Sequence, residues 1–97
     1  MQQMMMQAQK MQRELKKAMD ALKAQEFSIT KGGAVTVTMY GSKQIKKIDI
    51  DEDAFDKDNK EMVEDMIALA VNELVDQITA AEEEINEKIT GRSGGLF

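Results

Sequence analysis

The fold is decided near the middle of the chain, by the stretch Gly32-Gly33-Ala34-Val35-Thr36-Val37-Thr38-Met39-Tyr40-Gly41. Between the glycines, apolar side chains alternate with polar ones, which is typical of a β-strand with one buried face. The glycines at either end favour turns, so the segments on both sides should return as neighbouring strands. The β-prone run at residues 27–30 and the run at residues 44–50 complete a predicted three-stranded antiparallel meander over residues 27–50.

A long helix is predicted before this meander, over residues 1–26. The segment contains neither glycine nor proline, and strong helix formers dominate it. Its apolar residues recur at alternating steps of four and three, which is the a/d seam of a coiled coil. The residues of this seam are Met4, Ala8, Met11, Leu15, Ala18 and Leu22.

A second long helix is predicted after the meander, over residues 58–90. An acidic connection at residues 51–57 leads into it, and the spacing of Asp58 and Glu61 is typical of a capping box. An apolar stripe with helical spacing runs along the whole segment. Gly91 should end the helix.

The composition limits the chain to one domain and argues against several function classes. Its 97 residues suffice for a single α+β domain, in which we expect residues 91–97 to form a flexible tail. Histidine and cysteine are absent, so the usual catalytic base, the commonest metal ligand and thiolate sites are all missing. We therefore expect no enzyme activity, no small-molecule substrate, no cofactor and no metal. No apolar run is long enough to span a membrane.

Charge is distributed unevenly along the chain, whose formal net charge is −5. Residues 1–26 carry five basic and three acidic side chains, whereas residues 57–90 carry three basic and ten acidic ones. A polyanion should therefore meet the N-terminal third, because the acidic second half would repel it.

The basic residues of the first helix lie on the side away from its apolar seam when the sequence is placed on a helical wheel. They are Lys10, Arg13, Lys16, Lys17 and Lys23, with glutamines between them. Lysine and arginine neutralise phosphates, and glutamine hydrogen-bonds to phosphates or base edges. The alternative is an ordinary solvated helix face, and the residues alone favour it because Glu14 and Asp20 interrupt the basic surface.

Two further charged groups are interpreted as structural. Lys43, Lys46 and Lys47 lie around the second turn and third strand, where lysines commonly prevent edge-to-edge aggregation. The aspartates within residues 49–53 open like a calcium-binding loop, but Ala54 stands where that loop requires glycine. A solvated acidic loop explains them better.

The apolar stripes extend beyond what a three-stranded sheet can cover. Such surface normally marks an interface, and self-association is a common solution for small domains; a monomeric core is the alternative. We expect a homodimer in which the first helix and the far end of the second pack as a two-helix arm. The predicted interface residues are Val35, Val37, Met39, Met62, Met66 and Leu69.

Four segments resemble the YbaB/EbfC family of bacterial nucleoid-associated DNA-binding proteins. They are residues 6–12, 33–41, 45–51 and 58–66, and they occur in the family's order. The first resembles the start of the family's first helix, and the next two resemble its central and third strands. The last resembles the entry to its second helix.

This resemblance implies a tweezer-like homodimer that joins through the sheet region and projects helical arms. It implies a bacterial protein of the cytoplasm and nucleoid that binds double-stranded DNA and organises the nucleoid or regulates genes. DNA contact in the family is attributed to the arms, and we expect it to be mainly to phosphates. By position, the implied contact residues are Lys10, Arg13, Lys16, Lys17, Lys23 and Arg92.

A second hypothesis is a protein–protein interaction module associated with DNA repair or recombination, because a coiled-coil seam and an acidic helix can also dock a partner.

The chain departs from the family pattern at both ends. It begins inside the first helix, where the family usually has a leader containing glycine and asparagine, and its segment after Gly91 is shorter than usual.

Overall fold

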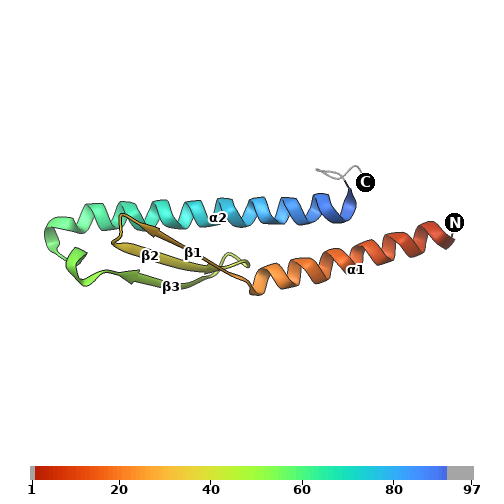
Figure 1. The fold of residues 1–97 in the computed structure, drawn as a ribbon, viewed down its shortest axis with the longest axis horizontal. Helices are drawn as coiled ribbons and strands as arrows, with labels where there is room; N and C mark the ends of the chain where they lie inside the picture. Colours follow the sequence, from red (N-terminus) through yellow and green to blue (C-terminus); the bar gives the residue numbers. More distant parts are fainter. Residues whose placement is uncertain (1, 92–97) are drawn as a thin grey trace.

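A computed structural model describes residues 2–91, in which two long helices are joined by a three-stranded sheet (Figure 1). In chain order the elements are α1 (Gln2–Ala24), β1 (Glu26–Lys31), β2 (Val35–Tyr40), β3 (Ile45–Ile50), the short 3-10 helices η1 (Glu52–Ala54) and η2 (Lys57–Asn59), and α2 (Lys60–Thr90). The molecule is elongated and measures 67 × 21 × 14 Å along its principal axes. The predicted helix–meander–helix order is confirmed. Of the expected tail, only Gly91 lies within the described residues.

The sheet is an antiparallel meander with the strand order β1-β2-β3. Gly32 and Gly33 form the first turn with φ angles of 57° and 65°, and the Ala34 N–H donates to the Lys31 carbonyl at 3.0 Å. A type I′ turn requires positive φ at both central residues, a conformation that glycine adopts without strain, and Lys31 and Val35 are the first paired residues on either side of this connection. The pair of glycines therefore fixes the β1–β2 register.

The core lies between β2 and the middle of α2. Six side chains form it, each at most 1% exposed: Val35, Val37, Met39, Ala70, Leu74 and Ile78. The three from β2 lie at alternate positions, and the three from α2 recur every four residues, so each set shares one face of its element. One helix therefore closes one face of the sheet.

The cover that α2 provides is incomplete, because α2 packs against β1 and β2 and leaves β3 at the open edge. In the β2–β3 register, Ile48 lies opposite Val37 and Ile45 lies opposite Met39, so all four side chains share the inner face. Ile45 and Ile48 are nevertheless 44% and 42% exposed. The apolar inner face of the sheet thus continues into solvent along β3.

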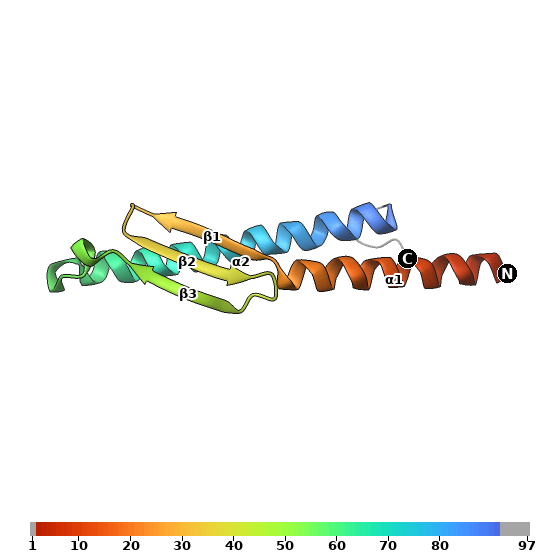
Figure 2. The ribbon, with the colours of Figure 1, turned by 60° about the horizontal axis from the view of Figure 1, so that its bottom comes forward.

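Helix α1 packs against α2 beyond the sheet, and the two form the predicted two-helix arm. Along α1, Leu22 is buried and Met11, Leu15 and Ala18 are half-buried, as the seam predicts. The N-terminal end of α1 projects past the end of α2 in two views (Figures 1 and 2). Accordingly Met4, the first residue of the seam, is 74% exposed.

The start of α2 differs from the predicted capping box. The helix begins at Lys60, and Asn59 precedes it without a side-chain capping hydrogen bond. Asp58 lies instead within η2, which is capped by the Asp56 carboxylate accepting from the Asp58 N–H at 3.0 Å. The capping box is therefore wrong, because a tight turn with its own aspartate cap precedes the helix.

Candidate nucleic-acid interface

The five basic side chains predicted on the first helix all lie exposed on α1. Lys10, Arg13 and Lys17 follow one row along the helix, and Lys16 and Lys23 follow another. Residues seven apart on one helix face are separated by about 10.5 Å. The basic face (Lys10, Arg13, Lys16, Lys17 and Lys23) therefore belongs to the projecting arm rather than to the sheet. Arg92 lies outside the described residues.

One member of the basic face is held by a carboxylate. The Lys16 Nζ donates to the Asp20 Oδ2 at 2.8 Å, one helical turn away. This hydrogen bond and the charge of Asp20 raise the pKa of Lys16, and the same contact lowers the pKa of Asp20. Both side chains are more than half exposed, so the pair adds little stability. Lys16 can therefore exchange Asp20 for another anion at small cost.

Within residues 2–91, the other four members of the basic face form no ion pair with a carboxylate. Lys10 and Arg13 border a shallow groove of about 280 Å³, which Met6, Gln7 and Gln9 complete. Two cations and two amides on one helix surface supply donors for phosphate oxygens. This part of the arm is an accessible cationic surface near the N-terminus.

The lysines near the sheet are engaged differently. Lys43 pairs with Glu82 of α2 at 3.2 Å, and Lys46 pairs with Glu26 of β1 at 2.9 Å. The hydrogen bond from Lys46 to Glu26 raises the pKa of Lys46, whose Nζ also lies 5.9 Å from the centroid of the Tyr40 ring. These contacts connect the turn after β2 to α2, and β3 to β1.

The predicted dimer residues divide into two sets. Val35, Val37 and Met39 belong to the core of one chain and have no accessible surface to offer a second copy, because α2 covers β2. The α2 flank (Met62, Met66 and Leu69) remains accessible, with Met62 42% and Leu69 58% exposed. Sequence periodicity alone did not distinguish a strand face covered by its own helix from one covered by a partner.

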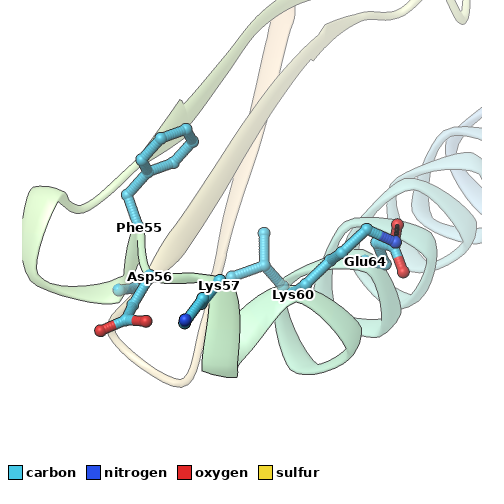
Figure 3. Close-up of a pocket in the computed structure, with 7 residues that line it drawn as sticks. Phe55, Asp56, Lys57, Lys60 and Glu64 are labelled. Carbon is cyan, nitrogen blue, oxygen red and sulfur yellow. Dashed lines mark hydrogen bonds and ion pairs between the residues drawn. The ribbon is translucent and has the colours of Figure 1, made fainter.

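Sequence reasoning missed a second apolar surface, the β3 patch (Ile45, Ile48 and Phe55). Phe55 lies on the connection after β3 and is 80% exposed. A groove of about 360 Å³ lies next to it, bordered by Lys60, Val63 and Glu64 of α2 (Figure 3). The signal in the sequence was an aromatic residue within a connection, residues 51–57, in which five of the seven residues are charged.

The described part of the chain was searched for clusters of metal-binding side chains and for membrane-spanning helices. Within residues 2–91, no three acidic side chains gather closely enough to hold a metal ion. Neither long helix of this part combines the length and hydropathy needed to cross a bilayer.

Comparison with known proteins connects these features to a family. Residues 1–93 match the YbaB/EbfC DNA-binding family. A nucleoid-associated protein of Agathobacter rectalis is 43% identical over 96 residues, covering 97% of this chain and 85% of the relative. One from Acetivibrio thermocellus is 43% identical over 94 residues, covering 93% and 80%. One from Chloroflexus aurantiacus is 35% identical over 96 residues, covering 98% and 96%. With its helix–meander–helix fold and a family match over nearly its whole length, this chain belongs to the YbaB/EbfC DNA-binding family.

Proposed function

We propose that this protein is a nucleoid-associated protein that binds double-stranded DNA as a homodimer and organises the nucleoid or regulates genes. The observation that carries the proposal is the basic face, whose five side chains are all exposed on a projecting arm. The family and the names of the curated relatives support DNA as the ligand and the nucleoid as the cellular site. Phosphates are the proposed contacts, because flexible lysine and arginine side chains spaced along a helix can follow the row of negative charges on a DNA strand.

The elongated shape supports contact through the arm despite the net charge of −5. At physiological ionic strength, repulsion between exposed charges fades over about 8 Å. A duplex lying against the basic face therefore meets the cations of α1 at contact distance. The carboxylates at the start of α2, such as Glu61, Glu64 and Asp65, lie at the opposite end of the molecule, which is 67 Å long (Figure 1). Contacts of this kind carry little sequence information, so we expect weak sequence preference.

The proposed homodimer joins on the side of the sheet that α2 covers. The β3 patch and the α2 flank both lie on this side, and they border the core at opposite edges. Glu73 of α2 pairs with Lys31 at the end of β1, which supports placing the α2 flank toward β1. A two-fold related copy would cover both surfaces with one symmetric contact.

Titration of a labelled duplex at several salt concentrations tests the DNA contact. Each neutralised phosphate contributes about −0.9 to the slope of log affinity against log salt. We expect binding at low salt that weakens steeply as salt is raised, with no strong preference among duplexes of different sequence. Absent or salt-insensitive binding would contradict the proposal.

A charge reversal assigns the contact to α1. Lys16→Glu with Lys17→Glu should weaken binding and reduce the magnitude of the salt slope by about 0.9 for each phosphate that is no longer neutralised. The matched control is Lys57→Glu with Lys60→Glu, which makes the same change in net charge at the opposite end of the molecule. Equal loss in both variants would show that net charge, and not the basic face, governs binding. Circular dichroism should be unchanged in both, and the dimer mass should be unchanged in the Lys16 and Lys17 variant. The control is compared at its measured dimer mass, because Lys57 and Lys60 border the groove beside Phe55.

A further inference from the structure

Three consecutive methionines lie exposed near the N-terminal end of α1. Met4, Met5 and Met6 are 74%, 61% and 66% exposed, whereas Met39 in the core is 1% exposed. The chain contains no cysteine, so the thioethers of methionine are its only sulfur groups. A peroxide oxidises a thioether to a sulfoxide where it can reach the sulfur. The first turns of α1 therefore present sulfur atoms that an oxidant can reach.

Of these three side chains, Met6 lies in line with the basic face. It precedes Lys10 by four residues and Arg13 by seven, a spacing that places side chains on one side of a helix. Met6, Lys10 and Arg13 also border the same shallow groove of about 280 Å³. Met4 borders instead the apolar groove between α1 and the end of α2, and Met5 borders neither groove. A chemical change at Met6 thus takes place directly beside two cations.

We propose that Met6 is a redox-sensitive modification site, and that its oxidation by hydrogen peroxide weakens the contact between the basic face and phosphate. The regulatory part of this inference rests on the proposed function. In the reaction, the Met6 sulfur attacks one oxygen of the peroxide, so that an S–O bond forms and the O–O bond breaks. The other oxygen leaves as water with both hydrogens. Sulfur loses two electrons and the peroxide gains them, and sulfoxide reductases reverse the change with electrons from thiols.

Oxidation converts Met6 from a weak hydrogen-bond acceptor into a strong one. Side chains four residues apart are neighbours on a helix, so the sulfoxide oxygen is within reach of the Lys10 ammonium. A hydrogen bond from Lys10 to this oxygen competes with the one that Lys10 donates to phosphate. Because Lys10 keeps its charge and two further donors, the loss of contact is partial. The affinity for duplex should fall roughly threefold, near the low end of what one hydrogen bond contributes in water.

Two matched leucine variants assign the effect to Met6. The first, Met4→Leu with Met5→Leu, retains the Met6 thioether, and the second, Met6→Leu, retains the other two. Leucine is apolar and favours helix as methionine does, but it has no sulfur to oxidise. Each variant is treated with hydrogen peroxide until mass spectrometry shows sulfoxide at its remaining methionines among residues 4–6. Its duplex affinity is then compared with that of its own untreated form, so that any difference in starting affinity cancels.

The variant that retains Met6 should lose roughly threefold in affinity on oxidation, and sulfoxide reductases should restore the loss. The Met6→Leu variant should keep its affinity through the same treatment. Equal loss in both variants, or no loss in either, would overturn the proposal. A loss that persists after the sulfoxide has been reduced would indicate other damage and would overturn it as well.

Two readouts without DNA separate this proposal from the proposed function. Mass spectrometry during oxidation should detect sulfoxide at Met6 well before Met39, whose side chain is buried. In the variant that retains Met6, the side-chain NMR resonances of Lys10 should shift on oxidation, whereas those of Lys57, near the start of α2, should not. Unchanged Lys10 resonances would overturn the proposal even where duplex binds. Shifted Lys10 resonances in a chain that binds no duplex would contradict the proposed function instead and leave the sulfoxide contact in place.

Discussion

Gly41 joins the arm to the sheet at a point where no side chain fits. Its N–H donates to the Gln25 carbonyl at 2.8 Å, and a Cβ placed on it would lie 1.8 Å from the Leu22 carbonyl oxygen. The neighbour is backbone at the end of α1, so no side-chain rotation relieves the clash. Any larger residue must separate α1 from the β2–β3 turn.

Gly41→Ala should therefore destabilise the protein by about 3 kcal/mol or more, the upper range for forcing extra atoms into a packed site. Urea unfolding followed by circular dichroism measures this loss. Gly33→Ala is the matched control, because its Cβ meets nothing within 4 Å and only its φ of 65° is unfavourable. The control should lose about 1–2 kcal/mol. A Gly41 variant no less stable than the Gly33 variant would contradict the close approach.

Asp20 is the residue that most directly limits the basic face. The Lys16 contact keeps its pKa below the ordinary value, so Asp20 is ionised wherever DNA binding is measured. Asp20→Asn removes that charge and releases Lys16, which should tighten duplex binding roughly threefold. Asp65→Asn, on an exposed position of α2, makes the same charge change away from the arm. If the two variants bind equally well, Asp20 has no local role.

At the scale of elements, alternation and heptad spacing predicted both long helices and all three strands. This succeeded because each pattern is a direct consequence of one buried face. The start of α2 was missed for a local reason. Asp56 and Asp58 both satisfy capping chemistry, and only the backbone geometry decides that Asp56 caps a 3-10 turn. Spacing alone cannot separate these two aspartates.

The candidate surfaces were predictable to different degrees. Exposure of the basic face follows from the helical wheel, since cations opposite an apolar seam point to solvent. The lateral offset of α2, which covers β1 and β2 but leaves β3 open, has no signature in the strand pattern. Val37 and Ile48 are neighbours in register on one face of the sheet. Consequently they differ in exposure: Val37 is buried, whereas Ile48 is 42% exposed.

For the whole molecule, the exposed apolar residues argue against an isolated chain. Phe55, Leu69, Ile45, Ile48 and Met62 are each more than 40% exposed. They flank a core of six fully buried side chains, which is small for 97 residues. Small domains with a thin core commonly complete it by association. A second copy on the α2 side would bury both apolar surfaces and leave the basic faces of two arms accessible.

Light scattering after size-exclusion chromatography measures the mass of the assembly, and glutamate substitutions on opposite sides of the sheet test this arrangement. The wild-type chain should have twice its mass of 10.9 kDa. Ile48→Glu with Phe55→Glu, and separately Met62→Glu with Leu69→Glu, should each give the monomer mass, because carboxylates would be buried in the contact.

The control is Ser28→Glu with Thr30→Glu. Both residues are exposed on the outer face, where Thr30 meets Thr36 at 2.8 Å and Ser28 meets Thr38 at 3.3 Å. It adds the same two charges as the β3 patch variant, yet it should remain dimeric. A monomeric control together with dimeric Ile48 and Met62 variants would place the second copy on the outer face instead. That result would leave the apolar inner edge of β3 without an explanation.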